Sequence, residues 1–238
     1  MTKRKQAGKN IAFVAFDADD TLWENEPKYR HAERFFLETL SKYVSEDVIL
    51  EELLKTEIQN LPTCGYGTKS FCMAMLETAM RVSKLKITTE ELYKLYEFGK
   101  SLLKHPVHLY EGVEKTLELI SKKYPTALIT KGDMLEQERK IFSSGLMDKF
   151  DFIEVVNEKN EKTYLKLIEK YKIGSSQFMM VGNSPKSDIL PVLKIGGHAI
   201  YIPAGEIWAH EIIDESNINY FDNYLKLKKF TDIAEVLL

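Results

Sequence analysis

The chain has 238 residues, of which 44% are hydrophobic, so it can bury a full core as one large domain or as a core domain with an insertion. Its 33 lysines and arginines stand against 36 aspartates and glutamates, and the net charge of −3 gives no global basic field for binding nucleic acid. No segment approaches the roughly 18 to 20 uninterrupted apolar residues that a membrane span requires, and the N-terminus lacks the apolar stretch of a signal peptide. We therefore expect a cytoplasmic protein, monomeric or homodimeric, whose partner is a small molecule rather than nucleic acid or a membrane.

The first predicted element is a strand over 11–16, six apolar residues rich in Phe, Val and Ile that suit burial on both faces. Residues 27–105 then carry apolar side chains at three- and four-residue steps, which is typical of helices. Beyond this block, helices and strands alternate. The predicted helices are 111–123, 135–143, 161–171 and 187–195, and the predicted strands are 126–129, 152–156, 178–181 and 198–202.

This alternation favours a parallel sheet covered by helices on both faces. The predicted fold class is therefore α/β, with a three-layer Rossmann-like core. The helical block of roughly 80 residues is too long for a loop, and we interpret it as an inserted α-helical cap domain. The predicted boundaries are 1–22 and 108–238 for the core and 23–107 for the cap.

Four of the predicted strands end at polar residues: Asp17, Thr130, the stretch 157–159, and Asn183 with Asp188. Ligands bind at the carboxyl ends of the strands in open α/β sheets, so we expect these side chains to meet at one edge. Asp19 lies two residues after Asp17 and can share the crevice. Close carboxylates repel unless a cation or a shared proton relieves them. The alternative is a solvated turn with helix-capping aspartates, which is the commoner role of an aspartate pair, and partners further along the chain decide between the two.

Transfer of a phosphoryl group to an aspartate would use the polar residues at all four strand ends. A carboxylate can attack phosphorus and form an aspartyl phosphate, which splits one hard displacement into two easier ones. Mg²⁺ bound by carboxylate oxygens would offset the repulsion between this nucleophile and an anionic phosphate. A lysine and a hydroxyl would bind the remaining phosphate oxygens, and a second carboxylate would protonate the leaving alcohol and then activate water.

With these motifs in this order, the chain resembles the haloacid dehalogenase-like hydrolase superfamily, and within it a phosphatase-type member with a helical cap inserted after the first core strand. The family's Asp-x-Asp-x-Thr signature is matched by residues 17–21, and its strand-ending Ser or Thr by Thr130. A lysine before a helix follows, and the acidic signature Gly-Asp-x-x-x-x-Asp is matched by residues 182–188. The resemblance covers the core from residue 11 to about residue 203.

The resemblance implies a role for each matched carboxylate. Asp17 would be the nucleophile and a Mg²⁺ ligand. Asp19 would be the general acid and base, and would bind the metal through its backbone carbonyl. Asp188 would be a further metal ligand, directly or through water. Asn183 stands where the family usually has an aspartate, but its amide oxygen can still ligate Mg²⁺ or orient a water.

Thr130 and a lysine would hold the phosphoryl group. Both Lys159 and Lys162 lie at the start of the predicted helix 161–171. Lys159 is favoured because Tyr164 follows it by five residues, a spacing that family members often show, and Lys162 is the alternative.

In the predicted cap, the segment 65–71 interrupts the helical pattern with two glycines. A glycine-flanked turn that opens a helix can bind an anion, so Lys69 and Tyr66 are candidate substrate-specificity residues. The alternative is a plain interhelical turn in which Thr68 caps the following helix.

The sequence thus predicts a Mg²⁺-dependent phosphatase that hydrolyses a small phosphorylated metabolite through an aspartyl phosphate on Asp17. Asp19 argues against the dehalogenase branch of the family, because a halide leaves without an acid. One alternative is a phosphomutase or phosphotransferase with the same intermediate. Another is a catalytically weak binding or regulatory protein of the same fold, for which Asn183 is the hint.

Overall fold

The computed structural model describes residues 10–205 and 208–238. These residues form two compact units, each described here by itself. The core unit contains the described residues up to Glu24 together with Val107–Lys131 and Lys140–Leu238. The helical unit contains Asn25–Pro106 and Gly132–Arg139.

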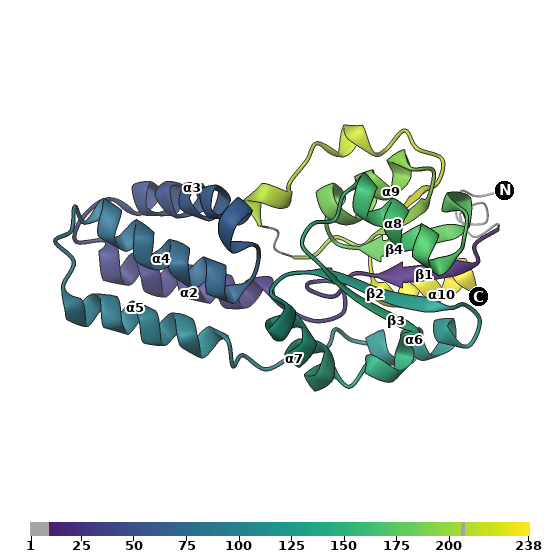
Figure 1. Cartoon of the computed structure of the whole chain (residues 1–238), viewed down its shortest axis with the longest axis horizontal. Coiled ribbons are helices and arrows are strands. Elements are labelled where there is room, and N and C mark those ends of the chain that lie inside the picture. The colour runs from purple at the N-terminus through teal and green to yellow at the C-terminus, as the bar shows by residue number, and fades with distance from the viewer. Residues whose placement is uncertain (1–9, 206–207) are drawn as a thin grey trace. The chain divides into compact units, whose positions relative to one another are not determined.

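The core unit is built on a parallel sheet whose strand order is β3-β2-β1-β4-β5-β6, and Figure 1 labels β1, β2, β3 and β4 of this sheet. The strands are β1 (Phe13–Phe16), β2 (Thr126–Lys131), β3 (Phe152–Val156), β4 (Phe178–Gly182), β5 (His198–Tyr201) and β6 (Tyr224–Lys226). The predicted α/β class with a Rossmann-like parallel sheet is therefore confirmed. The sequence pattern missed β6, a strand of only three residues at the edge of the sheet.

Helices cover both faces of this sheet because β1 alternates its side chains between two apolar clusters. Val14 and Phe16 pack in the cluster that contains α6 and α10, whereas Phe13 and Ala15 pack in the cluster that contains α8 and α9. The helices of this part of the chain are α6 (Val113–Ser121), α7 (Met134–Ser144), α8 (Glu161–Tyr171), α9 (Leu190–Lys194) and α10 (Ile233–Leu237). A strand that is buried on both faces reads as a continuous apolar run, which is why β1 was visible in the sequence.

The predicted helix 187–195 needs a correction at its start. The chain first makes a π-helical turn over Pro185–Ile189 and continues as α9 only from Leu190. Single π-helical turns are often found at functional sites.

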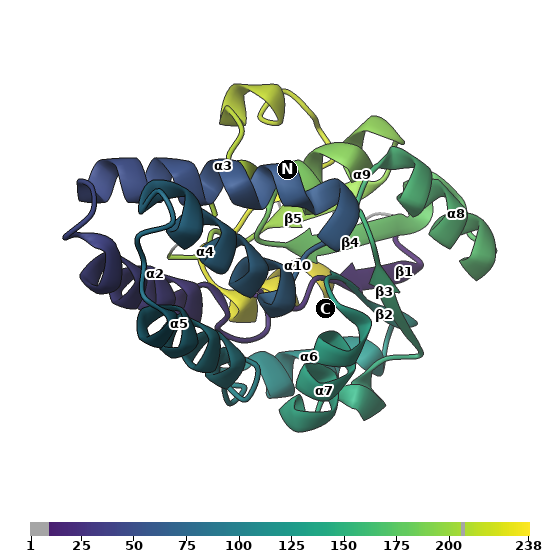
Figure 2. The ribbon, with the colours of Figure 1, turned by 60° about the vertical axis from the view of Figure 1, so that its left-hand side comes forward.

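Four helices form the body of the helical unit (Figure 2). They are α2 (Glu26–Leu40), α3 (Glu46–Cys64), α4 (Thr68–Val82) and α5 (Thr89–Leu102). Each contributes a fully buried apolar side chain to a single cluster, with Phe36, Leu53, Met75 and Leu95 at its centre. Apolar residues at helical spacing predicted this block, because each helix has one face to bury.

The segment 132–139 was assigned to the core from the sequence, but the structure groups it with the helices. The reason is a polar contact that the sequence pattern does not reveal. Glu136 of α7 is buried and accepts hydrogen bonds from the backbone N–H and the hydroxyl of Thr68, at 2.8 and 2.6 Å. The start of α7 is thereby fastened to the start of α4.

None of the helices in the two described ranges has the length and apolar character that crossing a bilayer requires.

Candidate active site

The predicted site residues of the core lie where the strand order reverses. Asp17 directly follows β1 and Asn183 directly follows β4, and these two strands are neighbours with Phe16 paired to Val181. The order of strands runs outward in opposite directions from this pair. The crevice at such a switch point is where open α/β sheets bind ligands.

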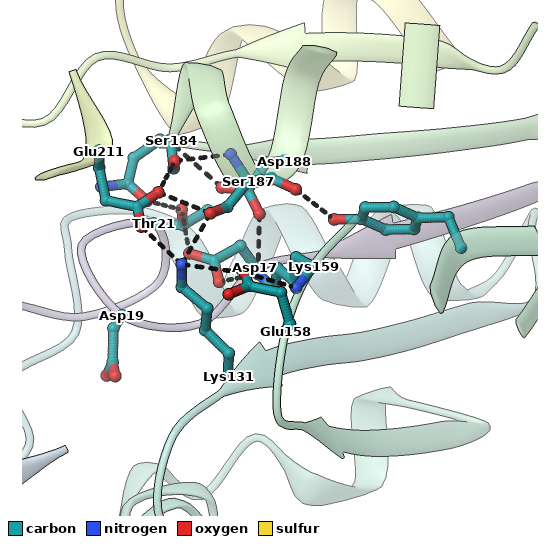
Figure 3. Close-up of polar contacts among 12 residues, drawn as sticks. Asp17, Asp19, Thr21, Lys131, Glu158, Lys159, Ser184, Ser187, Asp188 and Glu211 are labelled. Atoms are coloured by element: carbon teal, nitrogen blue, oxygen red, sulfur yellow. Dashed lines mark hydrogen bonds and ion pairs between the residues drawn. The ribbon is translucent and has the colours of Figure 1, made fainter. Parts of the chain in front are cut away.

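A lysine joins two carboxylates at this point (Figure 3). The ammonium group of Lys159 donates hydrogen bonds to Oδ1 of Asp17 and, at 2.7 Å, to Oδ1 of Asp188. All three side chains are buried, with relative exposures of 6% for Asp17, 4% for Lys159 and 1% for Asp188. The structure therefore brings together three predicted site residues that are far apart in the sequence.

The charges in this group are not balanced. Burial raises the pKa of Asp17 to about 7; the charge of Lys159 opposes this rise and the charge of Asp188 adds to it. Burial alone would lower the pKa of Lys159, but the two carboxylates outweigh it and hold that pKa above its ordinary value. Two carboxylates thus share one ammonium group, and the site still favours additional positive charge.

Thr21 connects Asp17 to Asn183. Its hydroxyl donates to Oδ2 of Asp17 at 2.9 Å and lies 3.2 Å from Oδ1 of Asn183. Thr21 was not among the predicted site residues, although its place as the last residue of the Asp-x-Asp-x-Thr signature was a usable signal. The contact places the amide oxygen of Asn183 beside the nucleophile candidate.

The turn after β4 is shaped to hold Asp188. The backbone N–H of Ser184 donates to Oδ2 of Asp188 at 2.9 Å, and the hydroxyl of the buried Tyr164 donates to the carbonyl of Ser187 at 3.0 Å. A β-carbon at Gly182 would overlap the carboxylate of Asp188, so glycine is required where β4 passes this side chain.

The predicted phosphate-binding residues are Thr130 and one of two lysines, and the structure places the two lysines in different surroundings. Thr130 is buried near the end of β2, two positions beyond Leu128, which pairs with Phe16. Lys159 occupies the site, whereas Lys162 lies in α8 with an exposed side chain. The geometry therefore favours Lys159 of the two.

Asp19 is not part of the Asp17 group. Its carboxylate accepts hydrogen bonds from Nε1 of Trp23 at 2.6 Å and from the ammonium group of Lys140 at 2.7 and 2.6 Å. Figure 3 shows it apart from the side chains around Asp17. Asp20 has a φ of 59°, a left-handed conformation that aspartate tolerates, and so forms the turn that separates Asp19 from Trp23.

The candidates of the helical unit are Lys69 and Tyr66. Lys69 forms an ion pair with Asp133, 2.9 Å from each carboxylate oxygen, and Tyr66 is half-buried. The anion at the N-terminus of α4 is the carboxylate of Glu136. The glycine-flanked turn thus does receive an anion, and that anion comes from the protein itself.

A second polar network lies beside the Asp17 group, and sequence reasoning missed its residues. The ammonium group of Lys131 donates to the hydroxyl of Ser187 at 2.7 Å and to Oε1 of Glu211 at 2.5 Å. Oε2 of Glu211 accepts from the hydroxyls of Ser184 and Ser187. The serines lie within the 182–188 signature and Lys131 follows Thr130, but nothing in the sequence singled out Glu211.

The side-chain oxygens of Asp17, Asp188 and Asn183 lie together and could bind a metal ion. The backbone carbonyl of Asp19 stays a predicted ligand. Across the described ranges, no cluster of three or more His, Cys, Asp or Glu side chains could hold one. Mg²⁺ usually takes only one or two protein carboxylates and completes its shell with water and phosphate oxygens. Two buried carboxylates, one of them with a raised pKa, and an amide oxygen fit that ion.

Comparison with known proteins identifies the family. A model of the haloacid dehalogenase-like hydrolases matches residues 11–196. A haloacid dehalogenase-like family hydrolase from Xanthomonas campestris is 36% identical to the chain, with a TM-score of 0.84 over 96% of this chain and 91% of that one. The chain belongs to the haloacid dehalogenase-like hydrolase family. The family resemblance drawn from the four motifs is thereby confirmed.

More distant members of known structure share the fold. A predicted phosphoglycolate phosphatase from Haemophilus somnus 129PT is 17% identical, with a TM-score of 0.65 over 96% of this chain and 98% of that one. A 2-haloacid dehalogenase from Pseudomonas syringae pv. Tomato DC3000 is 20% identical, with a TM-score of 0.61 over 95% and 97% of the two chains. No curated protein matches the sequence. The chain is a hydrolase of this family, and family membership leaves the choice of reaction to the residues of the site.

Proposed function

We propose that this hydrolase is a Mg²⁺-dependent phosphatase that acts on a small phosphorylated metabolite through an aspartyl phosphate on Asp17. The observation that carries the proposal is the pair of buried carboxylates, Asp17 and Asp188, that share Lys159. A nucleophile that must approach an anionic phosphate needs more positive charge than one lysine supplies.

Asp17, Asp188, Asn183 and the backbone carbonyl of Asp19 would hold Mg²⁺, which when bound would neutralise the charge of the phosphate oxygens. Asp17 attacks phosphorus with one carboxylate oxygen, and the bond between phosphorus and the ester oxygen breaks. Lys159 and Thr130 bind the oxygens of the phosphoryl group during this transfer. Lys159 is well suited because its raised pKa keeps it cationic.

Asp19 gives its proton to the departing alkoxide and then takes a proton from the water that hydrolyses the aspartyl phosphate. In the structure its carboxylate is held by Lys140 and Trp23. Release of these bonds, so that Asp19 can turn toward the ester oxygen, therefore precedes the first proton transfer. A halide would leave without this proton, so a carboxylate at position 19 favours phosphate esters over haloacids.

The test is a panel of phosphorylated metabolites assayed for phosphate release, with Mg²⁺ or with a chelator. Wild-type protein should release phosphate only with Mg²⁺, and Asp17→Asn should abolish turnover while it keeps the fold. Asp20→Asn is the matched control, because it makes the same change three residues further along the chain, at an aspartate to which no catalytic role is assigned.

Two results would contradict the proposal. One is phosphate release by Asp17→Asn at the wild-type rate. The other is release of chloride from 2-chloropropionate by a protein that is inert toward every phosphate ester. Transfer of phosphate to a sugar hydroxyl instead of water, detected by product analysis, would retain the aspartyl phosphate and change only the acceptor.

A further inference from the structure

Glu211 is a buried carboxylate that the mechanism above does not use. It ends a short 3₁₀ turn, Ala209–Glu211, that follows β5, and only 8% of its surface is exposed. Lys131 and the hydroxyls of Ser184 and Ser187 all donate to it. Although burial raises the pKa of Glu211, the charge of Lys131 and these hydrogen bonds outweigh it and lower that pKa to about 2.

The groups that Glu211 holds belong to the turn that carries the proposed metal ligands. Ser184 follows Asn183, and its backbone N–H donates to Asp188. The hydroxyl of Ser184 also accepts from the backbone N–H of Ser187 at 2.9 Å. Ser184 therefore links the two carboxylates, because its hydroxyl donates to Glu211 and its backbone N–H donates to Oδ2 of Asp188.

Glu211 also fixes Lys131, the residue after Thr130. The ammonium group lies between Oε1 of Glu211 and the hydroxyl of Ser187. Glu211 thus joins the carboxyl end of β2 to the turn after β4, the two strands that flank β1. A neighbouring contact strengthens this connection, because Lys186 donates to the carbonyl of His210 at 2.9 Å.

We infer that Glu211 is a positioning residue for the metal site, which holds Asp188 and Asn183 ready for the cation by way of Ser184 and Ser187. The inference rests on the Mg²⁺ site of the proposed function. Glu211 acts through the serines because both of its oxygens already accept hydrogen bonds from them or from Lys131. Residues that orient metal ligands typically change metal affinity about 10- to 100-fold when mutated.

The experiment is calorimetric titration of Mg²⁺ into the metal-free full-length protein without substrate. Glu211→Gln keeps the shape of the side chain but cannot accept all of these hydrogen bonds and cannot neutralise Lys131. We expect it to bind Mg²⁺ about 10- to 100-fold more weakly than wild type, with turnover at saturating Mg²⁺ close to wild type. This separation of metal affinity from turnover would not follow from general loss of structure, which circular dichroism checks.

Glu158→Gln is the matched control. Glu158 lies 3.7 Å from Lys131, so its loss removes the same charge from the neighbourhood of the same lysine, but Glu158 does not hold the two serines. If Glu158→Gln weakens Mg²⁺ binding only slightly and Glu211→Gln weakens it strongly, the result supports positioning of the ligands by Glu211 over a simple loss of negative charge near Lys131.

Equal Mg²⁺ affinity for wild type and Glu211→Gln would overturn the inference and leave the proposed phosphatase intact. Equal losses in Glu158→Gln and Glu211→Gln would overturn it too, because the field of one charge would then account for both. A wild-type protein that binds no Mg²⁺ would overturn the inference and the proposed function together. A wild type that binds Mg²⁺ but hydrolyses no phosphate ester would contradict the proposed function alone, and the titrations would still decide the role of Glu211.

Discussion

Each unit of the molecule buries a lysine against a carboxylate, and the two clusters differ in the balance between carboxylates and lysines. In the helical unit, Lys28 donates to Glu136 at 3.0 Å, and both side chains are almost fully buried. The same carboxylate receives two further hydrogen bonds from Thr68. Lys28 and Thr68 together satisfy both oxygens of Glu136, as expected of a structural contact.

In the core unit, a single lysine serves two carboxylates. Lys159 donates to Asp17 and Asp188, and the pKa of Asp17 still rises to about 7 because burial outweighs the charge of Lys159. A buried carboxylate that is poorly compensated costs stability unless something else supplies charge. A buried lysine and carboxylate therefore do not by themselves mark a site, whereas an excess of buried carboxylate over lysine does.

Replacement of each lysine by methionine is the strongest test of this difference. Loss of one partner from a buried ion pair typically costs about 3–5 kcal/mol, so both Lys28→Met and Lys159→Met should lower the free energy of unfolding in the presence of a chelator. At 100 times its dissociation constant for wild type, Mg²⁺ should stabilise wild type and Lys28→Met alike, by about 2.7 kcal/mol, because both keep the metal site. It should stabilise Lys159→Met by more, because there it also replaces the lost positive charge. Urea unfolding of both variants, with Mg²⁺ and with a chelator, measures this. Equal recovery of the two variants would remove the distinction between the clusters.

The same two variants should also differ in turnover. Lys159→Met removes a donor from the phosphoryl group, and loss of one such donor typically lowers the rate about 10²- to 10³-fold. Lys28→Met should keep turnover close to wild type per folded molecule, because Lys28 contacts Glu136 rather than the reacting groups. Initial rates with a phosphate ester, corrected for the folded fraction, compare them. A loss in Lys28→Met as large as in Lys159→Met would show that its cluster is not merely structural.

The core cluster could be predicted from the sequence, whereas the helical one could not. Asp17 and Asp188 stand at strand ends within short signatures, and a parallel sheet brings its strand ends together whatever the details of packing. Lys28 and Glu136 lie in helices, and lysine and glutamate are common on the exposed surfaces of helices, so nothing in the sequence marks these two as buried. Their contact joins positions 108 residues apart and depends on how α7 meets α2 and α4, which no local pattern encodes.

Dependence on long-range contacts also explains the other features that the sequence did not predict. Glu211 acquires its partners only when the segment after β5 folds back on the turn after β4, and Asp19 meets Lys140 across 121 residues of chain. The signature predicted a role for Asp19 but could not predict that its carboxylate would be held by a lysine. The edge strand β6 has three residues, too few to show a period.

The pH dependence of stability should show the smallest effect of these tests, and it is the test most specific to the core cluster. The pKa of Asp17 is raised from 3.8 to about 7 by burial, so between these values the folded protein keeps a proton that the unfolded chain has lost. The contribution of Asp17 to stability is therefore fully present below pH 3.8, falls as pH rises toward 7, and is level above that. One proton gives a slope of at most about 1.4 kcal/mol per pH unit.

Asp17→Asn is the reference, because asparagine does not titrate. In a chelator, the difference in unfolding free energy between wild type and this variant should become less favourable to wild type from pH 4 to pH 7. Mg²⁺ binds the ionised carboxylate, so it should lower the pKa of Asp17 and flatten this difference over the same range. Urea unfolding at a series of pH values gives both curves. If the difference in unfolding free energy does not change with pH in the chelator, Lys159 compensates the charge of Asp17 fully. The charges of the core cluster would then be as well balanced as those of the Glu136 cluster.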